Sequence, residues 1–165
     1  MTIMEFQAGA VQSIEKFNEF SQRHGLVGMT APDHLCFKCG SKESFEEMRA
    51  MFEQESQYMH QAIISGRRIA YIKLKQPIHT VLGEIWFIEL SDQKPDNSQV
   101  DSYNHIEVYG TQMSYDEMVA HLEESGANVV KVERPHHTTH NVDIGGFTFS
   151  CTRGPLVEKI KSEEM

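Results

Sequence analysis

Long apolar runs, basic excess and cysteine are scarce in this chain, and each shortage excludes a class of protein. No run of about 18 apolar residues is present, so no transmembrane helix and no membrane partner are expected. Lysine and arginine total 15 against 24 acidic residues, and a net charge of −9 argues against nucleic-acid binding. Three cysteines do not suit a disulfide framework. The first residues lack the basic and apolar regions of a secretory signal, so we expect a cytoplasmic protein.

What the chain does contain is an internal repeat. The ten residues from Ser44 match the ten from Ser114 at five positions, with three further close substitutions, at an offset of 70 residues (114 − 44). Upstream of each copy lies a strand-like run with a histidine in second place, His34 in one and His105 in the other. A repeat of this size indicates two copies of one supersecondary unit rather than a solenoid.

Each half is predicted to be a strand, a helix and then three strands. Ser44 with Glu47, and Ser114 with Glu117, have the spacing of capping boxes and should begin the two repeat helices. A leading helix is expected over about residues 7–24. The expected strands cover about 34–39, 58–64, 68–74 and 84–90, then about 104–109, 127–132, 140–144 and 147–153. In one compact domain we expect a helical lead (1–31), a first module (32–95), a second module (96–153) and a helical tail (154–165).

Alternation along each strand separates an apolar face from a mixed face. The strand that ends at Leu90 is predicted to place Trp86 and Ile88 on the apolar face, and Phe87 and Glu89 on the mixed face with Ile85. In the two first strands, the mixed faces carry the histidines. Helices should cover the apolar faces, which leaves the mixed faces to line a cavity.

Four short motifs follow one another along the chain: Asp33-His34-Leu35, Ile64-Ser65-Gly66-Arg67, Ile72-Lys73-Leu74 and His105-Ile106-Glu107. In this order they resemble motifs of the vicinal oxygen chelate superfamily, and most closely those of its YecM-like branch. The superfamily includes glyoxalase I, extradiol dioxygenases and fosfomycin-resistance proteins. The resemblance covers roughly residues 30–155 and implies an α+β fold in which two tandem βαβββ modules form a half-barrel-like mixed sheet around a cavity, with the helices outside.

The same resemblance implies a metal site to which each half contributes one ligand from its first strand and one from its last. His34, His105 and Glu89 match three of these positions. Aligning the last strands on their glycines places Thr152 opposite Glu89, so the fourth position is expected to hold solvent or to receive help from His140. Two histidines and a carboxylate suit zinc, iron(II), manganese or nickel, with open positions for water or substrate.

Two further features stay open on the sequence alone. Glu107 shares a strand face with His105, and we expect it to be a catalytic base or to orient that histidine, in preference to being a ligand. The segment from Pro135 to His140 is the most histidine-rich in the chain; His140 is its best candidate ligand, although its apolar neighbours could instead place it in the core.

The function expected from these residues is that of a divalent-metal-dependent enzyme acting on a small oxygen-rich molecule. Lyase or isomerase chemistry is preferred over dioxygenation. The alternative is a protein of the same fold that binds or sequesters a small molecule without turnover. A homodimer is compatible with either hypothesis. Basic residues near the predicted cavity could hold a substrate carboxylate or phosphate, or could instead be a solvated strand edge; they are Arg67, Arg68, Lys73 and Lys75.

Overall fold

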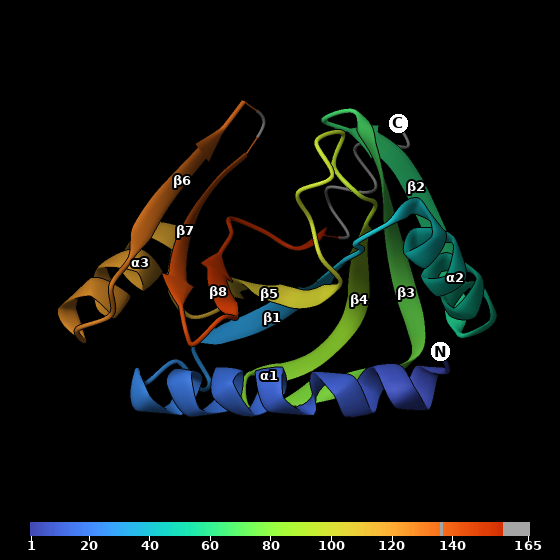
Figure 1. The fold of residues 1–165 in the computed structure, drawn as a ribbon. Coiled ribbons are helices and arrows are strands. Elements are labelled where there is room, and N and C mark those ends of the chain that lie inside the picture. Colours follow the sequence, from blue (N-terminus) through green and yellow to red (C-terminus); the bar gives the residue numbers. More distant parts are fainter. Residues whose placement is uncertain (136, 157–165) are drawn as a thin grey trace.

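A computed structural model describes residues 1–135 and 137–156, and within these ranges the chain forms three helices and eight strands (Figure 1). From residue 157 on, the predicted tail helix lies outside the described residues. The elements in chain order are α1 (Ile3–Arg23), β1 (Thr30–Lys38), α2 (Lys42–Gln54), β2 (Ser56–Ile64), β3 (Arg67–Thr80), β4 (Gly83–Ser91), β5 (Ser102–Gly110), α3 (Tyr115–Glu124), β6 (Val130–Arg134), β7 (His137–Asp143) and β8 (Thr148–Cys151).

All eight strands join one mixed sheet with the order β2-β3-β4-β1-β5-β8-β7-β6. In each half the first strand runs parallel to the last strand, β1 to β4 and β5 to β8, and the remaining neighbours are antiparallel. The two halves meet where β1 pairs with β5, also antiparallel. The predicted α+β fold of two βαβββ modules is confirmed.

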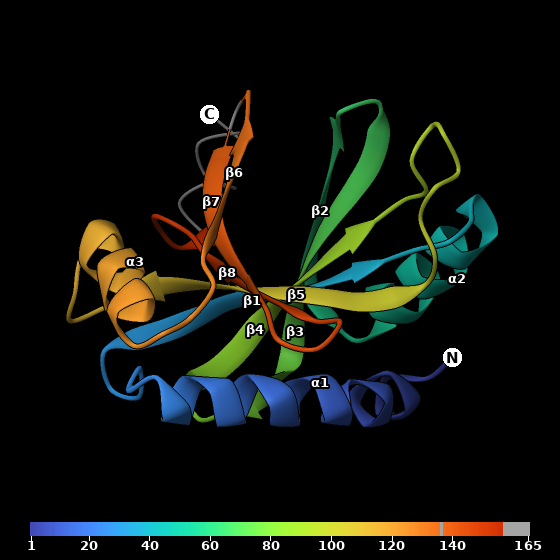
Figure 2. The ribbon, with the colours of Figure 1, turned by 60° about the vertical axis from the view of Figure 1, so that its left-hand side comes forward.

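The sheet bends into two wings that rise from the β1–β5 pair (Figures 1 and 2). β2 and β3 form one wing, β6 and β7 form the other, and α2 and α3 lie on their outer sides. α1 runs beneath the base of the sheet, on the convex side (Figure 1). The helices therefore lie outside, as predicted, and the inner concave face is left to the strands. No helix in the described ranges is both long and apolar enough to cross a bilayer.

Local capping explains where the repeat helices begin. In α3 the predicted capping box is present, because Ser114 accepts from the backbone N–H of Glu117 while the Glu117 carboxylate accepts from that of Ser114. The prediction for α2 was wrong by one turn. Ser41 caps this helix by accepting from the backbone N–H of Ser44, and the Ser44 hydroxyl instead donates to Asp101 at 2.7 Å.

α1 joins the two halves through aromatic contacts on the convex face. Near its start Phe6 lies 5.7 Å, centroid to centroid, from Phe37 on β1. Toward its end Phe17 and Phe20 lie 5.5 and 5.0 Å from Phe149 on β8. All five rings are buried, and aromatic pairs at such separations contribute about 0.5–1.5 kcal/mol each beyond their buried area.

One strand departs from the predicted alternation. Ile85 is fully buried in the main core, whereas Trp86 packs against a small apolar cluster on the concave face, the reverse of the prediction. The pairing of β3 with β4 shifts register between Lys73 and Ile78, and such an irregularity exchanges the two faces of a strand. Beyond the shift Glu89 keeps its predicted face. The concave cluster consists of Ile69, Tyr71, Phe87 and Leu156, with Ile64 and Trp86 packed on it.

Candidate metal centre

The β1–β5 pair brings the two repeat histidines together at the base of the concave face. In the ladder His34 lies opposite Glu107, and His105 lies opposite Cys36. The two imidazole rings therefore come from diagonal positions, with centroids 6.0 Å apart. This juxtaposition follows from the repeat, because equivalent positions of two modules meet where their first strands pair.

Two carboxylates converge on the same point. The Nε2 atom of His34 lies 3.0 Å from Oε2 of Glu89, which comes from the neighbouring strand β4, and 2.7 Å from Oε2 of Glu107. The same Glu107 oxygen lies 3.6 Å from Nε2 of His105. One ligand atom from each of these four residues lies within 4.8 Å of all the others. We call His34, Glu89, His105 and Glu107 the His/Glu cluster.

The residue before each histidine forms a hydrogen bond with the Nδ1 atom of its ring, which points away from the cluster. Nδ1 of His34 lies 2.7 Å from the Asp33 carboxylate, and Nδ1 of His105 lies 2.8 Å from the Asn104 side-chain oxygen. An acceptor at Nδ1 keeps the proton there and leaves the Nε2 lone pair directed at the cluster, which is how proteins orient metal-binding histidines. Asp33 also accepts from the backbone N–H of Leu156 at 2.5 Å.

The charges in the cluster perturb one another strongly. Burial alone would lower the pKa of His34, but the charge of Glu107 and contacts with Asp33, Glu107 and Glu89 together raise it well above its usual range. Burial would raise the pKa of Glu107, but the charge of His34 and contacts with His105, His137 and His34 lower it well below its usual range. Buried groups whose pKa values are strongly shifted by their neighbours occur preferentially at functional sites.

The remaining two members shift in the same directions. Burial opposes protonation of His105, but the neighbouring Cys36 and Glu107 raise its pKa to about 10. Burial opposes ionisation of Glu89, yet contact with His34 lowers its pKa overall. Without a metal, the raised pKa values of the histidines and the lowered pKa values of the carboxylates favour ion pairs of histidinium and carboxylate in the cluster.

The donor set of the cluster fits a divalent cation. His34 is only 1% exposed, and within the described part of the chain its Nε2 atom makes no hydrogen bond of acceptable geometry. The two carboxylate oxygens are near enough for ion pairs, but neither is aligned with the ring N–H. A buried, misaligned nitrogen facing two carboxylates is poorly satisfied as a hydrogen-bond donor and well placed as a ligand.

Comparison with known proteins places this chain in a family. A family model described as YecM protein matches residues 10–152. The chain belongs to the YecM family. It is 27% identical over 96 residues to Protein YecM of Escherichia coli (strain K12), a match that covers 58% of this chain and 51% of that protein. The matched part thus spans about half the length of the curated relative.

Two solved structures share the YecM-family fold seen here. One is titled "Structural Genomics, Protein EC4020", with a TM-score of 0.76, 22% identity, and coverage of 98% of this chain and 92% of that one. The other is hypothetical protein BH1468 from Bacillus halodurans C-125, with a TM-score of 0.50, 13% identity, and coverage of 76% and 94%. At these identities the likeness concerns the fold alone.

Strand register in this YecM-family chain corrects the predicted fourth position. Two residues after each first-strand histidine, Cys36 pairs with Glu89 in one half and Glu107 pairs with Ser150 in the other. Ser150, not Thr152, is therefore the counterpart of Glu89. Aligning the glycines misplaced it because β4 begins at its glycine whereas β8 begins two residues after the corresponding one.

The second half thus supplies its carboxylate from a different strand. The Ser150 hydroxyl is turned to the side-chain oxygen of Asn141 at 2.8 Å, and Glu107 on β5 provides the carboxylate instead. On the sequence alone, Glu107 shares a strand face with His105 and is predicted to be a base or an orienting residue. Its position in the cluster follows from the pairing of Glu107 with His34 across the β1–β5 ladder, which the sequence does not reveal.

The histidine-rich segment contributes a different residue from the one predicted. The structure does not bring His140 to the cluster, because its Nδ1 atom pairs with the Tyr115 hydroxyl on α3, on the helix-covered side. Its neighbour at the same face, Val142, is buried in the main core. His137 instead reaches the cluster, with Nε2 3.1 Å from Oε1 of Glu107. His136 lies outside the described residues.

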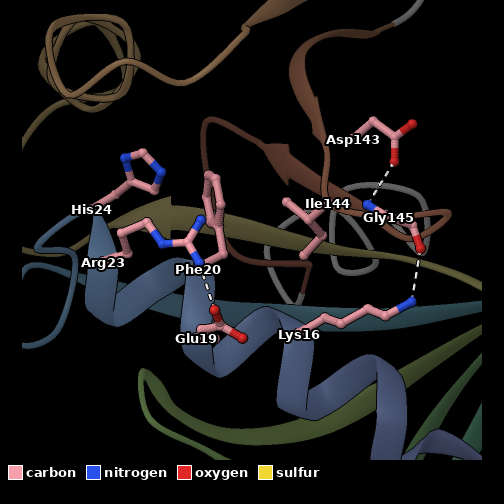
Figure 3. A pocket seen from close by; sticks show the side chains of 8 residues that line it. All are labelled: Lys16, Glu19, Phe20, Arg23, His24, Asp143, Ile144 and Gly145. Atoms are coloured by element: carbon pink, nitrogen blue, oxygen red, sulfur yellow. Dashed lines mark hydrogen bonds and ion pairs between the residues drawn. The ribbon is translucent and has the colours of Figure 1, made fainter.

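A separate hollow of about 390 Å³ lies between α1 and the turn that follows β7 (Figure 3). Lys16 reaches across it and donates to the backbone oxygen of Gly145 at 2.8 Å, while Glu19 pairs with Arg23 at 2.5 Å. The hollow is lined by as many acidic as basic side chains, Glu19 and Asp143 against Lys16 and Arg23, so it carries no net charge. The contact of Lys16 with Gly145 ties α1 to the second half.

Proposed function

We propose that the His/Glu cluster binds one divalent metal ion and that the chain is an enzyme of the vicinal oxygen chelate type. The observation that supports this is the convergence of two oriented imidazole nitrogens and two carboxylates, from both halves of a duplicated fold, within 4.8 Å. The YecM family by itself assigns no activity, so the proposal rests on this geometry and on the resemblance of the motifs.

The ligand types narrow the choice of metal. Neutral imidazole and carboxylate together suit zinc, iron(II), manganese and nickel, and they disfavour calcium, which prefers oxygen ligands alone. Four protein donors of this kind leave coordination positions open when the ion takes five or six ligands. An open position distinguishes a catalytic from a structural site.

The proposed reaction class is a lyase or isomerase reaction on a small oxygen-rich molecule. A metal held here would polarise neighbouring substrate oxygens and stabilise negative charge that develops on them. Within the chain, Asp33 and Asn104 orient the two histidines. His137 stands beside Glu107 with its side chain 31% exposed, so it is positioned to exchange a proton between the concave face and solvent.

The test is the metal content of protein purified without a chelating tag, followed by titration of the metal-free protein with Zn²⁺ and Mn²⁺. One equivalent of metal per chain is expected. His105→Ala should weaken binding at least 100-fold, since it removes a ligand. His79→Ala is the matched control, because the His79 side chain is 76% exposed on another part of the sheet. His140→Ala should leave metal affinity unchanged.

One observation favours the alternative, a protein that binds a small molecule without turnover. The histidines and carboxylates neutralise one another as buried ion pairs, so the cluster could be stable without a metal. If neither ion binds after reconstitution and His105→Ala lowers only the free energy of unfolding, the enzyme proposal fails and the binding protein takes its place.

A further inference from the structure

A second hollow, of about 360 Å³, lies where the tips of the two wings approach the loop after β4. The first half supplies Ser65 and Arg67 from the β2–β3 hairpin and Lys94, Pro95 and Asp96 from that loop, and the second half supplies Arg134 from the end of β6. Figure 1 shows these segments above the concave face, while the β1–β5 pair forms its base. The hollow thus combines both halves, as the His/Glu cluster does.

The hollow is positively charged in a chain that is otherwise acidic. Arg67, Lys94 and Arg134 line it against one acid, Asp96, whereas the whole chain carries a net charge of −9. Among the residues that the structure describes, no carboxylate lies within ion-pair distance of the three cations. A local positive patch on a negative protein requires a reason, because a solvated surface of this chain would be acidic by composition.

The side chains around the hollow are held by neutral partners. Arg67 donates to the side-chain oxygen of Gln99 at 2.5 Å, and Arg134 lies 3.5 Å from the Thr139 hydroxyl. Asp96 is occupied with the backbone N–H of Ser98, at 3.0 Å. Neutral partners position a guanidinium without cancelling its charge, so each arginine keeps donors for a further anion.

The charge of Lys38 interacts with groups of both the hollow and the His/Glu cluster. It stands on β1, two residues beyond Cys36 and on the same face, which places it about 7 Å further along the strand. Burial lowers the pKa of Lys38, the positive charges of Lys94 and Arg67 act in the same direction, and Cys36 and Glu89 oppose them. The pKa of Lys38 therefore depends on both the cations of the hollow and the carboxylate of Glu89 in the cluster.

We infer that the hollow binds an anionic group, a phosphate or a carboxylate, at one end of the molecule whose oxygens are held at the His/Glu cluster. This inference rests on the proposed function and names its substrate class: small acids or phosphate esters that carry vicinal oxygens at their other end. Arginine forks match both oxyanions geometrically, and the hollow offers one from each half of the fold. Substrate binding would then bridge the tips of the two wings.

The experiment titrates the full chain with inorganic phosphate and, separately, with succinate, and follows amide chemical shifts at low salt. We expect saturable shifts around residues 65–67, 94–96 and 134, with the tighter of the two ligands identifying the group. The double variant Arg67→Gln/Arg134→Gln should weaken binding at least tenfold, and Asp96→Asn should strengthen it. Arg49→Gln is the matched control, because Arg49 also donates to a neutral glutamine but on the outer side of the first wing.

Metal titration of the same variants separates the two proposals. Zn²⁺ affinity should be unchanged in the double variant, which lies outside the cluster. Anion binding without metal binding would support the hollow as an anion site and would refute the proposed metal-dependent enzyme. Wild-type protein that binds neither anion, or a double variant that binds them as tightly as wild type, would overturn the inference. Retention of the far-ultraviolet circular dichroism spectrum shows that the variants are folded.

Discussion

Asp33→Asn tests whether the residue before His34 orients it for metal. Asp33 uses both carboxylate oxygens, one for Nδ1 of His34 at 2.7 Å and one for the backbone N–H of Leu156 at 2.5 Å, and its side chain is 5% exposed. Asparagine has a single oxygen, so it can satisfy only one donor and turns its own NH₂ group toward the other. Leaving one buried donor unpaired costs about 1–3 kcal/mol.

Two measurements follow from this geometry. The free energy of unfolding of the metal-free protein, from urea titration, should fall by about 1–3 kcal/mol. Zn²⁺ affinity, from calorimetric titration, should fall about 10–100-fold, the usual cost of removing a partner behind a metal-binding histidine, which corresponds to about 1.4–2.7 kcal/mol. Both effects share one cause, because the ring of His34 loses its charge partner and must compete with the Leu156 N–H for the single remaining oxygen.

The pseudo-equivalent position provides the control. Asn104 already supplies a single oxygen to His105, at 2.8 Å, so Asn104→Asp keeps the acceptor and adds charge. Zn²⁺ affinity should stay equal or increase. The reasoning would be refuted if Asp33→Asn bound Zn²⁺ as tightly as wild type, or if both substitutions weakened binding equally, since a general effect of altered charge would then suffice.

Further outcomes concern the protons of His105 and of two buried thiols. In the metal-free chain the pKa of His105 is raised to about 10, so at neutral pH a metal must displace a proton; Zn²⁺ affinity should rise with pH up to that value, and calorimetry in buffers of different ionisation enthalpy should detect the released proton. The raised pKa also stabilises the metal-free fold fully below the ordinary histidine value, and this contribution should be lost as pH rises through about 10. Burial raises the pKa of Cys39 and Cys151 to about 12, so both thiols should resist alkylation at pH 8 in native protein and react in urea. Because the unfolded thiols ionise first, stability should also fall from about pH 9 upward; rapid native alkylation of both would contradict their burial.

The architecture could be predicted from the sequence because the chain contains two copies of one module. The repeat helices at an offset of 70 residues and the strand-borne histidines at an offset of 71 (105 − 34) predicted two modules. Pairing of the equivalent first strands then brings His34 and His105 together. Glu89 was also placed on the correct face. These predictions depend on period and spacing, which a single chain carries in full.

What the sequence could not provide was the register between paired strands. The shift of the β3–β4 pairing between Lys73 and Ile78 exchanged the faces of Ile85 and Trp86. Pairing across the β1–β5 ladder moved Glu107 into the cluster, and a two-residue difference before β8 moved the expected fourth position. His137 and His140 differ by an odd number on one strand, so they face opposite sides, and choosing between them required the position of α3.

The placement of the cluster has a mechanical consequence. Among the described strands, the β1–β5 ladder alone joins the two halves of the sheet. The aromatic contacts of α1 hold the two halves together on the convex side. On the concave side two members of the cluster belong to each half, His34 and Glu89 to one and His105 and Glu107 to the other. An ion held there would cross-link the two halves at the β1–β5 pair. Hydrogen exchange at the amides of β1 and β5 should therefore slow together when metal is added, while the amides at the wing tips continue to exchange as before.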